Sequence, residues 1–198
     1  SKNWYYAGLI NFKSQFAPGF NLPDDSTKIS DFLAPGYVLG AVGMDYKPND
    51  DFTFFISPIT AKMTIVNNSL LSDIGAFGVD SGKTTRLEVG GYLRLMWKKE
   101  VMKNVAFQTN LDLFSNYTED PDHIDVNWDN LLTMKVNKYI SATFATSLIY
   151  DHDIDILETK SDGSPKTDAE GNPRIGPRTQ FKYVLAIGFQ YKFGAGTN

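Results

Sequence analysis

The stretch 180–193 reads Gln-Phe-Lys-Tyr-Val-Leu-Ala-Ile-Gly-Phe-Gln-Tyr-Lys-Phe. Alternate positions along it are apolar or aromatic, and the positions between them are polar or small, apart from Val184. Successive side chains of a strand point to opposite faces of a sheet, so we expect a strand with one apolar face. Aromatic residues stand at both ends of this face and aliphatic residues in its middle, which is the order that a lipid bilayer favours.

Seven earlier segments alternate in a similar way. They are residues 4–15, 36–46, 52–66, 87–98, 105–117, 125–136 and 140–151. The connections between them are alternately long and short, with the tightest turn expected at 137–138. Short periplasmic turns and longer external loops give that rhythm in an up-and-down barrel, with both chain ends on the periplasmic side. The segments also reach the roughly 9–11 residues that cross a bilayer, whereas soluble strands average about 5–6.

The predicted fold is therefore all-β: an antiparallel up-and-down transmembrane β-barrel of about eight strands. The barrel domain covers residues 1–193 and is followed by a short tail, 194–198. Within 52–66 the apolar positions change parity, because Phe52, Phe54 and Ile56 indicate one face and Ile59, Met63 and Ile65 the other. Pro58 lies between the two sets and predicts a β-bulge or a locally unpaired position.

Composition narrows the function classes. The chain has no cysteine, 14% aromatic residues and a formal net charge of −4. It therefore has no disulfide or thiolate chemistry, and no positive patch predicts nucleic acid as a partner. No apolar run reaches the roughly 18 residues of a membrane helix, so any crossing must use strands. Residues 1–4 already read as the start of a strand, so we expect a secreted precursor to carry a signal peptide before Ser1.

Ionisable side chains fall on one parity of each strand. In a membrane barrel they would line the lumen: Glu88, Arg94, Asp112, Asp129, Lys135 and Lys182. A lipocalin-like soluble barrel that binds a small ligand alternates equally well, but its apolar face points inward. Periodicity alone leaves both alternatives open. The membrane interpretation assigns the interface aromatics to Trp4, Trp97, Trp128, Tyr191 and Phe193.

Acidic residues gather at one predicted end of the barrel. If the strands on either side of 137–138 pair so that residue numbers sum to 276, Asp125 faces Asp151 and His123 faces Asp153. Carboxylates that face one another repel, and a Ca²⁺ or Mg²⁺ ion would relieve the repulsion. The candidate metal ligands are Asp125, Asp151, Asp153 and His123. The alternative is a solvated acidic rim, or acids paired with Arg174, Arg178 or Lys182, and no cofactor.

Nothing in the sequence predicts an enzyme. The patterns G-x-S-x-G, G-x-x-x-x-G-K-[ST], G-x-G-x-x-G and H-E-x-x-H are all missing, and the chain has two histidines. We therefore expect no catalytic residues.

Six blocks of sequence carry a family resemblance. Residues 31–37, 43–50, 75–79, 113–117, 124–128 and 134–138 are similar to a Bacteroidota outer-membrane β-barrel family that is catalogued only as a domain of unknown function. The resemblance implies an outer-membrane location in a Gram-negative bacterium and brings no activity. In that family further strands precede the position of Trp4, which implies that this chain is the C-terminal part of a longer barrel.

The expected function is that of a structural or assembly component of the outer membrane. Its expected partners are outer-membrane lipid, the barrel-assembly machinery and other outer-membrane proteins in a larger complex. A narrow, porin-like transport barrel and the lipocalin-like binder are the alternative functions.

Overall fold

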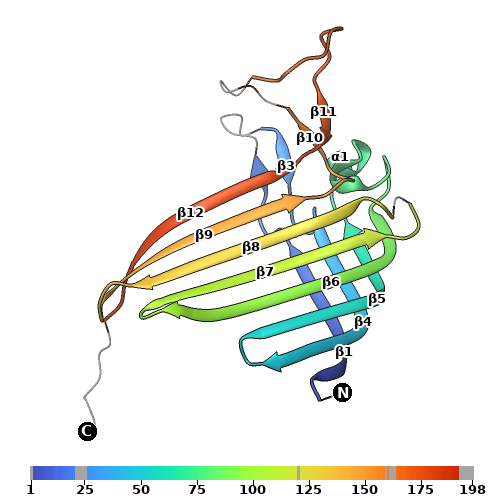
Figure 1. Cartoon of the computed structure of the whole chain (residues 1–198). Coiled ribbons are helices and arrows are strands. Elements are labelled where there is room, and N and C mark those ends of the chain that lie inside the picture. Colours follow the sequence, from blue (N-terminus) through green and yellow to red (C-terminus); the bar gives the residue numbers. More distant parts are fainter. Residues whose placement is uncertain (1, 21–25, 120, 159, 161–163, 192–198) are drawn as a thin grey trace.

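Eight long strands form one antiparallel sheet in the computed structural model, which describes residues 2–20, 26–119, 121–158, 160 and 164–191 (Figure 1). They are β1 (Trp4–Ser14), β4 (Gly36–Asn49), β5 (Phe52–Ile65), β6 (Thr85–Met102), β7 (Val105–Asn116), β8 (Ile124–Lys135), β9 (Ile140–Tyr150) and β12 (Gln180–Phe189). Their order across the sheet is β1-β4-β5-β6-β7-β8-β9-β12. This confirms the prediction of an all-β fold with about eight antiparallel strands.

Short turns lie at one end of the sheet, which we call the turn end. Residues 50–51 join β4 to β5, residues 103–104 join β6 to β7, and residues 136–139 join β8 to β9. The expectation that 137–138 is the tightest turn is wrong. Asn137 explains the wider turn, because its side-chain oxygen accepts hydrogen bonds from the N–H groups of Tyr139 and Ile140 at 2.8 and 2.9 Å.

Long connections lie at the opposite end, the loop end. They contain β2 (Gly19–Phe20), β3 (Lys28–Ser30), α1 (Ser69–Asp73), the short helix η1 (Ala76–Gly78), β10 (Asp155–Leu157) and β11 (Ile175–Pro177). The first two long connections are joined by a hydrogen bond of 2.8 Å from Asn67 N–H to the Leu33 carbonyl. No helix among the described residues is long and apolar enough to cross a membrane. The alternation of long and short connections is as the sequence predicts.

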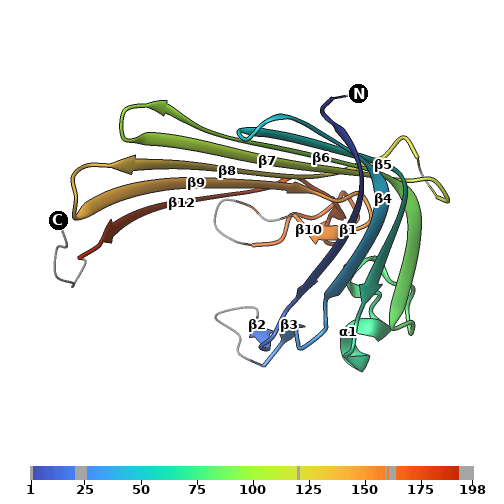
Figure 2. The ribbon, with the colours of Figure 1, turned by 90° about the horizontal axis from the view of Figure 1, so that it is seen from below.

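The sheet is open at both edges. β1 pairs with β4 and β12 pairs with β9, and the described residues contain no pairing between β1 and β12 (Figures 1 and 2). Closure into a barrel, as the sequence predicted, is therefore not found. The strand predicted over 180–193 forms a ladder from Gln180 to Phe189, and the tail 194–198 lies outside the described residues.

The register places one apolar and one polar face on the sheet. Leu93 pairs with Leu113, and Leu113 pairs with Val126, which carries the apolar face across β6, β7 and β8. On the other face of β6 and β7, Arg94 lies opposite Asp112. The parity assignments made from the sequence for β6, β7, β8, β9 and β12 agree with this register.

A β-bulge in β5 explains the change of parity in that strand. Ser57 pairs with Tyr92 and Thr60 pairs with Gly90, so three steps on β5 match two on β6. The Ser57 hydroxyl oxygen lies 2.8 Å from the carbonyl oxygens of Val42 and Ile59, and the Thr60 hydroxyl donates to it at 2.9 Å. The predicted irregularity at Pro58 is confirmed. The sequence assigned the apolar residues of 52–56 and of 59–65 to opposite faces, whereas the bulge places both sets on the same face.

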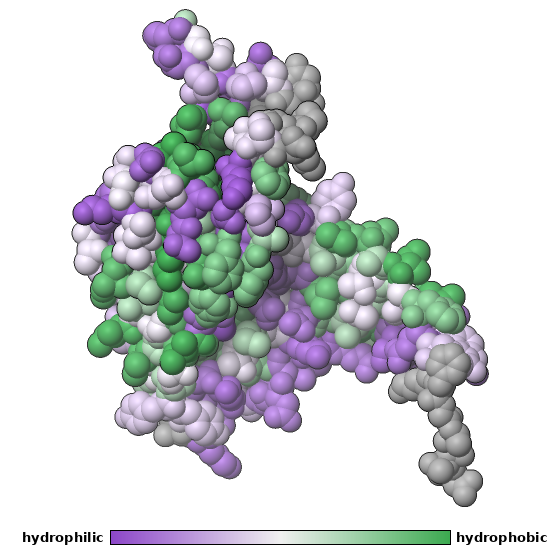
Figure 3. All heavy atoms as spheres, turned by 180° about the vertical axis from the view of Figure 1, so that it is seen from behind, coloured by the Kyte–Doolittle hydropathy of each residue, from purple (hydrophilic) through white to green (hydrophobic). Residues whose placement is uncertain are grey.

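The sheet curls around its polar face. A cavity of about 520 Å³ is lined by residues from all eight long strands, including Lys13, Tyr37, Arg94, Asp112 and Gln180. In Figure 3 hydrophilic atoms run through the hollow of the sheet, and hydrophobic atoms cover the flanks beside it. The concave face therefore carries the polar and charged side chains, together with a buried cluster of Ala41, Phe55, Tyr92 and Phe114.

Burial is inverted relative to a water-soluble protein. Glu88 is 2% exposed and Thr60 is 1% exposed on the concave face. On the convex face Tyr6 is 94% exposed, Ile10 88% and Ile187 80%. Charged residues are almost never fully buried in soluble domains unless they are paired, and large contiguous apolar surfaces are rarely left uncovered.

Two of the predicted interface tryptophans lie near the turn end. Trp4 begins β1, and its ring centroid is 5.0 Å from that of Tyr46. Trp97 pairs with Phe52 at the start of β5, and its ring lies 5.9 Å from that of Phe107. These four aromatic rings form pairs on the apolar face.

The remaining predicted interface aromatics are less regular. Trp128 lies within β8, nearer to the loop end, and donates a hydrogen bond of 2.9 Å to the Thr109 hydroxyl. Tyr191 follows β12, and its ring stacks on Tyr139 with centroids 5.9 Å apart. Phe193 lies outside the described residues.

Candidate functional site

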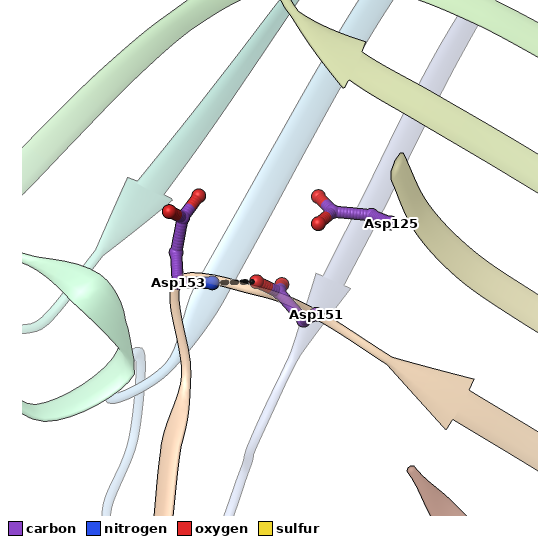
Figure 4. Close-up of side chains that lie close together, drawn as sticks. All are labelled: Asp125, Asp151 and Asp153. Carbon is purple, nitrogen blue, oxygen red and sulfur yellow. Dashed lines mark hydrogen bonds between the residues drawn. The ribbon is translucent and has the colours of Figure 1, made fainter. Parts of the chain in front are cut away.

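The pairing of β8 with β9 has the register predicted from the sequence. Trp128 pairs with Leu148 and Met134 with Ala142, so the residue numbers sum to 276. The ladder ends at Val126 and Tyr150, and the next pair along it is Asp125 and Asp151. The two carboxylates therefore lie close together at the loop end of the concave face. Asp125 belongs to β8, and Asp151 to the chain that leaves β9 (Figure 4).

Asp153 completes a close group with these two residues. One carboxylate oxygen from each of Asp125, Asp151 and Asp153 lies within 4.8 Å of the others. The Asp153 N–H donates to Asp151 Oδ1 at 3.0 Å, which turns the chain so that both side chains approach Asp125 (Figure 4). A cation at the centre of three such oxygens would need only a small contraction to reach the 2.3–2.6 Å typical of Ca²⁺, and a larger one for Mg²⁺.

Lys62 already supplies a positive charge to this group. Its ammonium lies 2.7 Å from Asp125 Oδ2, 3.7 Å from Asp151 Oδ2 and 3.4 Å from Glu88 Oε2. The bulge in β5 sets Lys62 on the concave face, where it pairs with Glu88 in the register of β5 and β6. A single lysine thus bridges carboxylates from β6, from β8 and from the residue after β9.

Arg86 forms the second cationic centre. Its guanidinium contacts Glu119, lies 2.9 Å from Asp153 Oδ2 and lies 3.8 Å from Glu88 Oε1. It also donates to the Gly78 carbonyl at 3.1 Å, which anchors the connection that contains η1. We call the whole set the rim network; its members are Lys62, Arg86, Glu88, Glu119, Asp125, Asp151 and Asp153. Five carboxylates in it face two cationic side chains.

Burial and charge oppose the ionisation of Asp151. Burial has the largest effect and raises the pKa of Asp151 above its ordinary value, and the nearby carboxylates of Asp125 and Asp153 raise it further. Lys62 lowers the pKa of Asp151 without cancelling these effects. The rim network therefore keeps an excess of negative charge that Lys62 does not fully neutralise.

His123 takes a different position from the one predicted for a metal ligand. The close group consists of the three aspartates, whereas the His123 ring stacks on His152 with centroids 3.5 Å apart. A cavity of about 10 Å³, the volume of roughly one water molecule, lies beside the two rings. The backbone N–H of His152 donates to Asp125 Oδ1 at 3.4 Å, so the stack flanks the rim network.

The remaining predicted lumen residues also lie on the concave face, at different positions along their strands. Arg94 and Asp112 form an ion pair with Nε and Oδ1 2.6 Å apart, and the Tyr92 hydroxyl donates to the same carboxylate at 2.6 Å. Asp129 and Lys135 are exposed residues of β8, and Lys182 is an exposed residue of β12. Only Glu88 among the predicted set belongs to the rim network.

The sequence predictions missed the two cationic members of the rim network, Lys62 and Arg86, and placed Glu119 in the acidic rim without a specific partner. Arg174 and Arg178, which were considered as partners for the acids, contact Glu158 instead. The alternating pattern around Lys62 could have identified it only with the bulge at Pro58 taken into account. Arg86 lies two residues before Glu88, so its parity placed it on the same face.

Comparison with known proteins adds no assignment: the chain matches no family model, no curated protein and no solved structure. Chemically, the rim network holds charges in fixed positions and ties the loops to the sheet.

Proposed function

We propose that this chain is part of an integral outer-membrane β-barrel of a Gram-negative bacterium, with a non-enzymatic structural or assembly role. The observation that carries the proposal is the inverted burial: Glu88 is 2% exposed on the concave face while Ile10 and Ile187 are 88% and 80% exposed on the convex face. Lipid stabilises an apolar outer surface and a polar interior, whereas water does the opposite.

The same distribution opposes the lipocalin-like alternative. A soluble ligand-binding barrel places its apolar parity on the concave side. Here the concave side carries Arg94, Asp112 and Lys62. A small apolar ligand in this cavity would lie beside these charges as well as beside apolar side chains such as Leu39 and Phe114.

Open edges support a barrel that is completed by further strands. Unpaired backbone groups cannot face hydrocarbon, so the free edges of β1 and β12 need partners in a membrane. All neighbouring strands are antiparallel, so β1 and β12 run in opposite directions. An even number of strands therefore fits between them, in agreement with the longer barrel that the family resemblance implies.

Extraction and gel mobility test the membrane location. The full-length protein should remain with outer membranes until detergent is added, and it should migrate differently on gels with and without heating. A protein that is fully soluble without detergent would overturn the proposal.

Transport through the lumen is the second candidate function. The 520 Å³ cavity and the open sheet favour it, because additional strands would widen the space beyond what side chains can fill. Steady conductance of the complete barrel in planar bilayers would support transport. A closed, non-conducting barrel would leave the structural role.

The last strand supports recognition by the barrel-assembly machinery. Its alternating apolar face ends in the sequence Tyr191-Lys192-Phe193, which is similar to the final strand of outer-membrane barrels. Phe193→Asp should lower the amount of protein in the outer membrane, and Gln190→Asp on the other parity is the control. Equal levels of both variants would show that the terminal aromatic has no special role.

A further inference from the structure

Three cationic side chains converge on one acid in the connection between β9 and β12. Glu158 is 7% exposed, and its carboxylate contacts Arg178, lies 3.7 Å from Arg174 and lies 3.5 Å from Lys166. Among the described residues Glu158 is the one acid within ion-pair distance of these cations. Counted over Glu158 and these three described cations, the group has an excess of two positive charges.

Backbone hydrogen bonds hold the group in place. Glu158 N–H donates to the Arg174 carbonyl at 2.8 Å, Lys166 N–H to the Glu158 carbonyl at 2.7 Å, and Arg174 N–H to the Lys166 carbonyl at 2.8 Å. Arg178 follows β11 directly, one residue after the pair formed by Asp155 and Pro177. The three cations thus come from neighbouring backbone segments with a fixed spacing.

A substantial part of each cationic side chain faces solvent. The side chains of Arg174, Lys166 and Arg178 are 57%, 44% and 42% exposed. A guanidinium carries five N–H donors, and Glu158 can accept only a few of those in the group. Asp168 lies on the same arm, but its carboxylate accepts from the N–H groups of Glu170 and Asn172 at 3.0 and 2.8 Å, and the ion pairs of the three cations go to Glu158.

We propose that Lys166, Arg174 and Arg178 form a binding site for a phosphate-bearing ligand, with Glu158 as the positioning residue. A phosphate monoester carries about −1.5 to −2 charges at neutral pH, which matches the excess of two positive charges. Arginine pairs with phosphate oxygens through parallel N–H donors, and lysine adds a point charge. The site lies at the loop end, on the arm formed by β10 and β11 that projects beyond the sheet (Figure 1). The phosphate can come from a lipid headgroup or from a soluble molecule.

Titration of the full chain with inorganic phosphate tests the site without relying on the membrane proposal. The protein is kept in zwitterionic micelles at low salt, and binding heat is measured by calorimetry. We expect saturable binding that Arg174→Gln with Arg178→Gln weakens by about tenfold or more, since charge-assisted hydrogen bonds are lost. Lys99→Gln with Lys103→Gln removes the same charge at the turn end and should bind like the unchanged protein.

A second variant distinguishes the loss of phosphate-binding charges from a structural change in the arm formed by β10 and β11. Arg174→Lys with Arg178→Lys keeps the charges and should retain part of the affinity. Equal phosphate affinity in the unchanged protein and in the glutamine variant, or no binding by the unchanged protein, would overturn the proposal. Phosphatidylcholine vesicles with and without phosphatidic acid identify the source: preference for phosphatidic acid that depends on the arginines assigns a lipid headgroup, and phosphate binding without that preference assigns a soluble ligand.

Discussion

The ammonium of Lys62 lies 2.7 Å from Asp125 Oδ2, although the two residues are 63 positions apart in the chain. The contact joins β5 to the second residue of β8 across the concave face, and the same lysine approaches Glu88 and Asp151. A side chain of the protein therefore supplies part of the positive charge that the acidic rim would otherwise take from a metal ion.

Replacement of Lys62 should make the melting temperature of the protein depend on Ca²⁺. In Lys62→Met the carboxylates lose their central cation, so we expect a loss of roughly 3 kcal/mol in the free energy of unfolding. Millimolar Ca²⁺ should then raise the melting temperature of the variant in detergent, because an ion that binds only the folded state stabilises it. The unchanged protein and Lys62→Arg should melt alike with Ca²⁺ and with chelator. A calcium shift in the unchanged protein that Asp125→Asn with Asp151→Asn abolishes would instead assign the aspartates as a metal site.

Ionisation of Asp151 should reduce stability as the pH rises. Its pKa is raised in the folded state, so the folded protein binds this proton more tightly than the unfolded chain does. The stability associated with the proton is present at low pH and is lost as the pH rises through the folded-state pKa. Asp151→Asn should thus melt at a higher temperature than the unchanged protein at pH 8, and the difference should vanish below about pH 4. Asp80→Asn, which changes an exposed acid outside the rim network, is the control variant.

The ion pair of Arg94 and Asp112 should behave as a unit. Removing one partner leaves a partly buried charge, so Asp112→Leu should lower the free energy of unfolding by roughly 3 kcal/mol. Arg94→Met combined with Asp112→Leu should recover most of that loss, because apolar side chains of similar size need no partner. Denaturant titration of the two single variants and the double variant measures the coupling. Additive losses would mean that the two residues act independently.

Val42 on the convex face distinguishes lipid from water as its surroundings. It is 70% exposed, so Val42→Arg should change stability by no more than about 0.5 kcal/mol if the face meets water. If the face meets the hydrocarbon of a bilayer, the cost should be about 2–4 kcal/mol. Folding titrations in phospholipid vesicles measure the difference, and Val42→Leu is the apolar control. A neutral Val42→Arg would place this face outside the membrane.

Local pattern was sufficient to predict most of the sheet. The alternation in β8 and β9, together with the turn between them, predicted the pairing of Trp128 with Leu148 that the structure has. This worked because side-chain period and antiparallel register are both fixed by short stretches of chain. Closure of the barrel is a long-range property of β1 and β12, and no local pattern reports whether two edges meet.

The rim network was only half predictable for the same reason. Asp125 and Asp151 are brought together by one hairpin, so their proximity followed from the register. Lys62 and Arg86 reach the acids from β5 and β6, on the other side of the concave face. Contacts across the hollow depend on the curvature of the whole sheet.

The bulge at Pro58 has a consequence for how related chains should be compared. Without Pro58, Ile56 and Ile59 would flank Ser57 in strict alternation, and Thr60, Lys62 and Thr64 would keep their present face. A one-residue gap in the middle of β5 therefore leaves both faces of the sheet intact. Alignments that forbid gaps inside strands would misplace half of this strand, and would assign Lys62 to the wrong side of the molecule.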